Sequence, residues 1–367
     1  MHKVSNFLVV LISFFVLPNV NASEPIKIAV VGALSGQFKN VGMEFKQGVG
    51  SAVQMINAKG GVLGRSLQVS EHDDECNPEK ARQIAKDIVK NGISMVVGHL
   101  CSGASIAASD VYAANGIVQI SPASTAPQFT DRGLANVFRT CGRDDMQGFV
   151  VAEHMARRYR TKAIGIVADT SVYSTELAKL TKQSLKRAGI SVAMDRQVPK
   201  NTVDFNAIMD EIKKLGIEVL FFPSYAQQAT IVLKEAKKRG IKLKFVGSDT
   251  LMNDDFLNLA GNLTDGVELS FPPDPSHDRR NRKLTRQLKE KGFNPEAFTF
   301  YTYAAVEVWA QAVTAAKKLD VNAVVSVLRK NKIDTVLGRI TFDSKGDVSQ
   351  PGFVMYRYID GEPDYIQ

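Results

Sequence analysis

Two loops rich in serine and threonine have the composition of an anion-binding site. One loop covers residues 98–103 (GHLCSG) and the other covers residues 121–127 (SPASTAP). Each follows an expected strand and offers a hydroxyl, at Ser102 or Thr125, together with free backbone N–H groups near a helix start. N–H donors and the helix dipole both favour a carboxylate. Taken alone, however, either hydroxyl is better explained as an ordinary helix cap.

The sequence lacks the motifs of the common catalytic, metal and nucleotide sites. Five histidines are present, but none forms H-E-x-x-H, and no Cys/His group has zinc spacing. The stretch 32–36 (GALSG) has neither the dinucleotide spacing nor the G-x-S-x-G elbow. The carboxylates at 73–75 are better explained as hydrated loop residues than as metal ligands, and His99 as a structural residue. We therefore expect a binding protein rather than an enzyme, with no metal and no cofactor.

The elements that position these loops alternate between strand and helix. The first half of the chain has four short apolar runs, each followed by a helix-like or loop segment: 26–32, 67–72, 94–98 and 117–121. Continuous apolar strands between amphipathic helices indicate a parallel sheet that is covered on both faces. Ligands of such sheets bind at the carboxyl ends of the strands, where both hydroxyl-bearing loops lie.

The alternation restarts near the middle of the chain. Strand-like runs at 162–168, 191–198, 219–223 and 244–247 are separated by helical patterns. Two such series predict an α/β protein with two doubly wound parallel-sheet lobes. From Phe271 the pattern changes to a proline-rich stretch, followed by two long expected helices at 279–291 and 298–319.

The first 22 residues have the features of a Sec signal peptide. Lys3 supplies a positive charge, residues 7–17 form an apolar run, and Val20-Asn21-Ala22 fits the cleavage rule, so we expect cleavage after Ala22. A membrane anchor is the alternative, but no later stretch approaches the ~20 apolar residues of a spanning helix. The mature chain would then be exported to the periplasm and is long enough for two domains.

The basic residues are spread over the chain rather than gathered in one block. The formal charge is +8, and the densest groups lie on or beside expected helices without interleaved aromatic residues. This distribution is typical of solvated helix faces, so we expect no nucleic-acid partner. A weak attraction of these basic residues to anionic lipid is the alternative.

Two of the three cysteines could form a disulfide in an exported protein. Cys76 and Cys101 follow strand-like segments, so they share one sheet edge if those strands are parallel neighbours. A bridge between them would close a loop of roughly 25 residues and stabilise the fold by roughly 3 kcal/mol. Cys141 would stay reduced and buried. Three free thiols are the alternative.

Several blocks of the chain match one family too densely to be explained by composition. They include 28–36 (IAVVGALSG), 56–61 (INAKGG), 97–102 (VGHLCS), 121–127 (SPASTAP), 302–305 (TYAA), 334–338 (DTVLG) and 342–346 (FDSKG). In these blocks the sequence resembles the periplasmic branched-chain amino acid (Leu/Ile/Val) binding proteins of ABC transporters, which belong to the type 1 periplasmic binding proteins.

The resemblance implies two lobes joined by a multi-stranded hinge. Residues 23–143 with 272–350 would form lobe 1, and residues 144–271 with 351–367 would form lobe 2. It also implies the Cys76–Cys101 disulfide.

The resemblance further implies a role for individual residues of the cleft. Ser102 and the backbone N–H of Thr125 would hold the ligand carboxylate. The Ala123 carbonyl, the Thr125 hydroxyl and Asp249 would take the ammonium group. The remaining positions would close over the ligand or line its side-chain pocket, and they are Tyr173, Tyr225, Leu100, Cys101, Ser124 and Phe298. A buried ammonium group needs a counter-charge, which agrees with an acidic residue at this point.

Two positions depart from the pattern of the family. Val41 stands where members often have an aromatic residue, and Asp249 stands where glutamate is frequent. The pocket therefore has more room on one side, and the carboxylate is one methylene shorter. Phenylalanine and γ-amino acids are alternative ligands beside leucine, isoleucine and valine.

The function that the resemblance implies is capture of a free amino acid by lobe closure. The protein would act as a monomer and deliver leucine, isoleucine or valine to the permease subunits of an ABC transporter. The alternative is a receptor subunit that senses a similar ligand, and neighbouring permease and ATPase genes would favour transport. An exported enzyme on the same two-lobed scaffold is a third reading, which turnover of a bound ligand would support.

Overall fold

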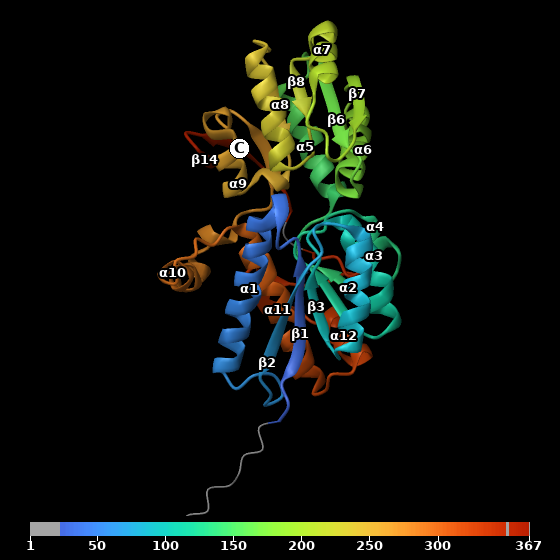
Figure 1. Cartoon of the computed structure of the whole chain (residues 1–367), viewed down its shortest axis with the longest axis vertical. Helices are drawn as coiled ribbons and strands as arrows, with labels where there is room; N and C mark the ends of the chain where they lie inside the picture. Colours follow the sequence, from blue (N-terminus) through green and yellow to red (C-terminus); the bar gives the residue numbers. More distant parts are fainter. Residues whose placement is uncertain (1–22, 350–351, 367) are drawn as a thin grey trace, which may run out of the picture.

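The computed structural model describes residues 23–349 and 352–366, which form two α/β lobes stacked end to end (Figure 1). The expected signal peptide at 1–22 lies outside the described residues. No helix in the described part of the chain has both the length and the apolar composition that crossing a membrane requires.

The first sheet has five parallel strands in the order β2-β1-β3-β4-β5. In chain order β1 to β5 span Ile26–Gly32, Leu67–Asp73, Met95–Gly98, Val118–Ser121 and Val137–Arg139. Alternate residues of the central strands face opposite layers of helices. Ile28 and Val30 pack with the α1 and α11 layer, whereas Ala29 and Val31 pack with the α2 and α3 layer. This is the burial on both faces that the apolar strand runs predict.

The second sheet has seven strands in the order β14-β13-β10-β9-β8-β6-β7. In chain order β6 to β10, β13 and β14 span Ile164–Asp169, Val192–Val198, Val219–Phe221, Lys244–Gly247, Glu268–Phe271, Val354–Ile359 and Glu362–Ile366. The first five of these are parallel, but β13 and β14 join the edge of the sheet antiparallel. The expectation of two mainly parallel α/β sheets is confirmed, with the parallel strands β5 and β10 and this antiparallel edge as additions.

Helices cover both faces of each sheet, as Figure 1 shows. In chain order α1 to α12 span Lys39–Ala58, Pro78–Lys90, Ser102–Ala114, Gln128–Asp131, Asp144–Arg158, Val172–Arg187, Asn206–Leu215, Ala226–Lys238, Asp254–Ala260, Arg282–Glu290, Ala297–Ala316 and Val321–Lys330. The hairpin of β11 (Ile333–Thr335) and β12 (Gly338–Ile340) contacts α11. The expected helix at 279–291 is interrupted, because a short 3-10 turn at Arg279–Asn281 precedes α10.

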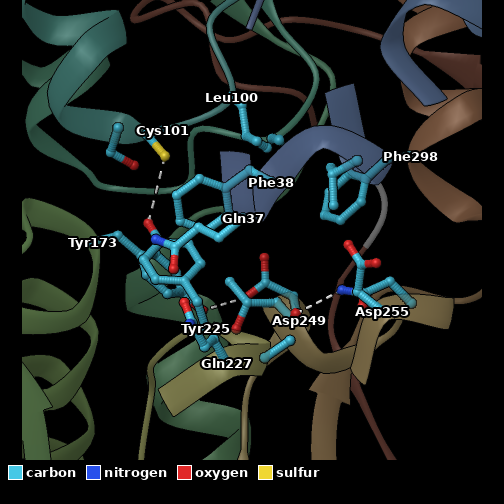
Figure 2. Close-up of a pocket in the computed structure, with 16 residues that line it drawn as sticks. Gln37, Phe38, Leu100, Cys101, Tyr173, Tyr225, Gln227, Asp249, Asp255 and Phe298 are labelled. Atoms are coloured by element: carbon cyan, nitrogen blue, oxygen red, sulfur yellow. Dashed lines mark hydrogen bonds between the residues drawn. The ribbon is translucent and has the colours of Figure 1, made fainter. Parts of the chain in front are cut away.

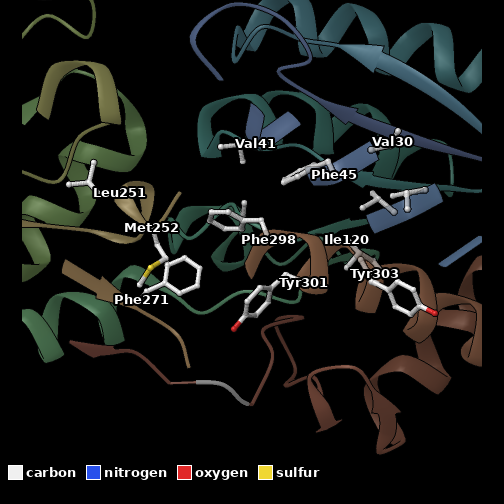
Figure 3. Close-up of a cluster of buried hydrophobic side chains, with 14 of the residues drawn as sticks. Val30, Val41, Phe45, Ile120, Leu251, Met252, Phe271, Phe298, Tyr301 and Tyr303 are labelled. Carbon is white, nitrogen blue, oxygen red and sulfur yellow. The ribbon is translucent and has the colours of Figure 1, made fainter. Parts of the chain in front are cut away.

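The chain passes between the two lobes three times. It crosses from β5 to α5, returns after β10 to α11, which packs on α1, and finally runs from the β11–β12 hairpin to β13 of the second sheet. Buried apolar side chains continue across this junction, where the Phe271 and Phe298 ring centroids lie 5.5 Å apart (Figure 3). The exact lobe boundaries at 143/144, 271/272 and 350/351 stay a prediction, and the last lies outside the described residues.

The disulfide between Cys76 and Cys101 is present, with the Cα atoms 5.3 Å apart. It joins the loop after β2 to the residue that precedes α3, at the edge of the sheet where the ligand loops were expected. Cys141 is free and buried, as expected.

A buried carboxylate holds three elements of the second lobe together. Glu268, at the start of β10, is 2% exposed. It accepts hydrogen bonds from His154 of α5 (2.6 Å), from Tyr159 (2.9 Å) and from Arg357 of β13 (Nε, 3.2 Å). Burial alone would raise the pKa of Glu268, but the hydrogen bonds from His154 and Arg357 outweigh it and lower the pKa to about 2.

We expect this carboxylate to contribute to acid sensitivity. A lowered folded-state pKa gives stability that is present above the ordinary carboxyl pKa and is lost as the pH falls towards the folded value. The wild-type protein should therefore lose about 2 kcal/mol more than Glu268→Gln between about pH 6 and pH 2.5, measured by urea unfolding. Glu218→Gln removes an exposed carboxylate paired with Lys162 and should behave like the wild type. Parallel acid profiles for wild type and Glu268→Gln would contradict the assignment.

Candidate functional site

A cavity lies between the lobes, where the carboxyl ends of the strands of both sheets face each other (Figure 2). Its empty volume is about 620 Å³, counting the part that opens to solvent. Residues of both lobes line it, and ligands of open α/β sheets bind at the carboxyl ends of the strands. The cavity is therefore the candidate site.

The first lobe supplies hydrogen-bond donors to the cavity wall. Ser102 is the first residue of α3, is 3% exposed and lines the cavity. Its hydroxyl does not cap its own helix, because Oγ accepts the backbone N–H of Ala126 at 3.3 Å. The first-turn N–H groups of a helix have no partners within the helix and carry its positive dipole end. This wall can therefore bind an anion such as a carboxylate.

Ser124 lies behind the wall rather than in it. Its Oγ lies 3.1 Å from the carbonyl oxygens of both His99 and Leu100 and 2.7 Å from Ser105 Oγ, and it is not part of the cavity lining. Ser124 was expected to close over the ligand or line its side-chain pocket. In the structure its hydroxyl instead joins the two ligand loops. Ala123, Leu100 and Cys101 line the cavity, whereas Thr125, like Ser124, is not among its lining residues.

A buried arginine forms hydrogen bonds to the second ligand loop, residues 121–127. Arg139, at the end of β5, is fully buried. Its Nη1 donates to the Ser124 carbonyl at 2.6 Å, and its Nη2 donates to the Ala126 carbonyl at 3.0 Å. Its Nε lies 2.7 Å from Asp347 Oδ1, on the segment that runs back towards the second lobe. The guanidinium therefore fixes the backbone conformation of residues 124–126 against the crossing segment.

The second lobe supplies an acidic group. Asp249 follows β9, lines the cavity and is 3% exposed. Its Oδ1 accepts hydrogen bonds from Tyr173 Oη at 2.6 Å and from Gln147 Nε2 at 2.8 Å. Burial raises the pKa of Asp249, and the hydrogen bonds from Tyr173 and Gln147 partly oppose this rise. A cation beside the carboxylate would offset the cost of burying its charge.

Buried oxygen atoms that accept no hydrogen bond from a backbone N–H, an amide or a charged group that the structure describes lie near Asp249. They are Thr125 Oγ1, Gln147 Oε1 and both carboxylate oxygens of Asp144. All three residues are at most 1% exposed. Burial and the charge of Asp249 raise the pKa of Asp144 well above its ordinary value, while the neighbouring Thr125 hydroxyl lowers it. Buried acceptors without donors are costly, so this region is suited to a group that carries several N–H bonds.

Aromatic residues bring the two lobes into contact around the cavity. The Tyr225 hydroxyl lies 3.7 Å from Cys101 Sγ across the cleft. The Tyr225 ring lies 4.7 Å from the Phe38 ring and 5.7 Å from the Tyr173 ring, measured between centroids. The Asn40 side-chain amide also donates to Asp255 across the cleft. The lobes are therefore in the closed arrangement, with both expected tyrosines at the cavity (Figure 2).

The rest of the cavity wall is mostly apolar. Leu100, Phe298, Val41 and Phe38 line it from the first lobe. Val41 is a small side chain that packs in the apolar cluster that also contains Phe298 (Figure 3). This end of the cavity is suited to an aliphatic side chain.

Several lining residues were not expected from the sequence. Gln37 and Phe38 follow β1, Ala226 and Gln227 begin α8, and the segment after β9 adds Thr250, Asn253 and Asp255. All of these follow strands of the two sheets, so the rule that ligands bind at carboxyl strand ends could have indicated them. Asp144 and Gln147 gave no such signal, because an acidic residue at a helix start is equally explained by the helix dipole.

The cavity combines hydrogen-bond donors, an acidic group and an apolar wall, which are the groups of a small-molecule binding site. No group of three or more His, Cys, Asp or Glu side chains within residues 23–349 and 352–366 is placed to hold a metal ion. His99 is fully buried, with Nδ1 2.5 Å from Asp74 Oδ2 and Nε2 3.1 Å from the Tyr112 hydroxyl, which is a structural role.

Comparisons with known proteins agree with this picture. A family model described as periplasmic binding protein matches residues 25–361. The Leu/Ile/Val-binding protein homolog 1 of Brucella abortus is 36% identical over 330 residues, which covers 89% of each chain. The Leu/Ile/Val-binding protein of Escherichia coli is 34% identical over 331 residues, or 90% of each chain.

A solved structure of similar architecture is an ABC transporter substrate-binding protein from Desulfitobacterium hafniense in complex with Leu. It has a TM-score of 0.78 and 27% identity, and the match covers 94% of the present chain and all of that one (100%). The expectation of a binding protein rather than an enzyme is confirmed by these relatives. The chain belongs to the periplasmic binding protein family, within the group of Leu/Ile/Val-binding proteins and their homologues.

Proposed function

We propose that the protein captures a free branched-chain amino acid in the periplasm by closing its lobes and delivers it to the permease of an ABC transporter. The observation that carries this proposal is the opposition of two complementary walls across one cavity. The start of α3, with Ser102, offers donors on one side, and the buried Asp249 offers an anion on the other. A zwitterion is the small ligand that satisfies both walls at once.

The α-carboxylate would bind Ser102 and the N–H of Thr125. The ammonium group would bind Asp249, with the Ala123 carbonyl and the Thr125 hydroxyl as further acceptors. The Thr125 hydroxyl supports this assignment, because its oxygen accepts no hydrogen bond from the described residues while the hydroxyl acts on Asp144, so an ammonium group can donate to it. Tyr173 and Tyr225 would enclose the ligand from the second lobe.

The apolar end of the cavity favours leucine, isoleucine or valine as the side chain. Leu100, Phe298 and Val41 would contact it. The names of the curated relatives, which are Leu/Ile/Val-binding proteins and homologues, support the same ligand class.

The closed arrangement supports capture by lobe closure. Asp249 belongs to the second lobe and Ser102 to the first, so a ligand that binds both residues favours the closed form over the open one. Delivery to a permease is proposed from the family, whose solved members include a substrate-binding protein of an ABC transporter.

Calorimetry on protein that has been unfolded, freed of ligand and refolded tests the proposal. The titrants are the common protein amino acids, and we expect at least one of leucine, isoleucine and valine to bind with micromolar affinity or better. Two analogues of leucine separate the two walls: N-acetylleucine lacks the ammonium group, and leucinamide lacks the carboxylate. Both should bind far more weakly than leucine. Absence of binding by all three branched-chain amino acids would reject the proposal.

A further inference from the structure

We propose that Asp144 holds a proton in the empty protein and releases it when the ligand's ammonium group enters beside Asp249. This inference rests on the proposed function, because it takes a free amino acid as the ligand. It adds a charge-balancing residue, one that lies behind the cavity wall and acts through Asp249 and Thr125.

Asp144 is a buried acid whose one hydrogen-bonding neighbour among the described side chains is the Thr125 hydroxyl. It is 0% exposed, and no backbone N–H, amide or charged group of the described residues donates to its carboxylate oxygens. Its position is fixed by its backbone, since its N–H donates to the Thr125 carbonyl at 3.0 Å and it is the first residue of α5. The side chain therefore stays at the junction between the ligand loop and the second lobe.

The groups around Asp144 do not neutralise it. Its pKa is raised by Asp249 and Asp145 and lowered by Arg139 and the Thr125 hydroxyl. Asp144 in turn raises the pKa of Tyr173 and Tyr225 and that of Cys141. Arg139 is the positive group among them, but its guanidinium is already bound to Asp347 and to two loop carbonyls. Asp145 faces outward and pairs with Arg143 at 3.0 Å.

Ionising both of two neighbouring buried carboxylates costs much more free energy than ionising one of them. Asp249 has two donors, Tyr173 and Gln147, which stabilise its charged form. Asp144 has the Thr125 hydroxyl alone among the described residues, so it is the member of the pair that takes the proton. Burial and the neighbouring Asp249 raise the pKa of Asp144 well above its ordinary value, in agreement with this assignment.

An arriving ammonium group changes this balance. Its positive charge offsets the repulsion between the two carboxylates and makes ionisation of Asp144 favourable. The O–H bond of Asp144 then breaks, its electron pair stays on the carboxylate oxygen, and the proton passes to the buffer. The ligand keeps all its ammonium protons, so the ammonium group replaces the lost proton beside the two aspartates, and the charge of the ligand's α-carboxylate is offset at the other wall by Ser102 and the Thr125 N–H.

Calorimetry of leucine binding in buffers of different ionisation enthalpy measures the released proton. Acetate and MES are suitable on the acid side, and phosphate and Tris at neutral pH and above, because the apparent binding enthalpy then changes with the buffer in proportion to the protons released. We expect a release that approaches one proton per leucine towards the acid side of the range from about pH 5 to pH 8. In the same range the affinity should rise with pH, by at most about tenfold per pH unit.

Two matched variants assign the proton to its residue. Asp144→Asn keeps the shape of the side chain but cannot titrate, so it should bind leucine without buffer dependence and with nearly pH-independent affinity. Asp145→Asn removes the neighbouring, exposed acid and should release the proton as the wild type does.

The outcomes separate this inference from the proposed function. Leucine binding by the wild type with no buffer dependence and no pH dependence overturns the inference alone, and needs no variant to be folded. The same proton release from Asp144→Asn as from the wild type also overturns it. If none of the branched-chain amino acids binds, the proposed function fails and the inference fails with it.

Discussion

Replacing Asp249 with alanine should weaken leucine binding by about 2–5 kcal/mol, which is roughly thirtyfold to several thousandfold. The reason is that the ligand's ammonium group would stay buried in the closed cleft without its counter-charge. Asp249 also anchors the Tyr173 hydroxyl at 2.6 Å, so the variant loses an ordered contact of the second lobe. Calorimetry with ligand-free protein measures the change.

Asp255→Asn is the matched control for Asp249→Ala. Asp255 is a second acid at the same cavity (Figure 2), but it bonds to Asn40 across the cleft. We expect Asp255→Asn to change the affinity much less than Asp249→Ala. Unchanged affinity in Asp249→Ala, or an equal loss in both variants, would show that the ammonium group binds elsewhere.

Replacing Arg139 with methionine should destabilise the protein by about 3 kcal/mol, near the lower end of the cost of breaking a buried ion pair. The lower end is expected because Arg143 still reaches Asp347 Oδ2 at 2.6 Å. The carbonyls of Ser124 and Ala126 would nevertheless lose their buried donors. Urea unfolding measures the loss, and leucine affinity should fall as well, because the loop that bears Thr125 loses its support.

The control for Arg139→Met is Arg339→Met. Arg339 forms an ion pair with Asp334 at 2.8 Å, but both side chains are largely exposed. Exposed pairs contribute little, so this variant should unfold close to the wild type. If the free energy of unfolding of Arg139→Met were also close to that of the wild type, the guanidinium would not be what holds residues 124–126 in place.

The parts of the site that the sequence could indicate are those that directly follow strands. The run of strands and helices places Ser102 after β3 and Asp249 after β9, and the structure brings both to one cavity. The family resemblance added Tyr173 and Tyr225, which periodicity could not have singled out. Their contacts with Asp249 and Cys101 depend on the packing of two lobes that are far apart in the sequence.

Other features depended on three-dimensional detail that spacing does not encode. Ser124 and Thr125 are neighbours in an irregular loop, where the direction of each side chain follows from the local backbone and not from a regular period. The hydroxyl of Ser124 consequently points to the 99–105 segment. Strands β13 and β14 were not expected, because a short antiparallel edge has little apolar periodicity of its own.

The threefold crossing of the chain makes each lobe depend on residues from distant parts of the sequence. The face of the first sheet that carries Ile28 and Val30 is covered in part by α11, which contacts β3 and β4 and begins at residue 297. A fragment that ends before this helix would leave that face exposed to water, even though all five strands of the first sheet had already been synthesised. Neither lobe is therefore an autonomous unit during biosynthesis, and shortening the protein to a single lobe would require a new connection that replaces the missing strands and helices.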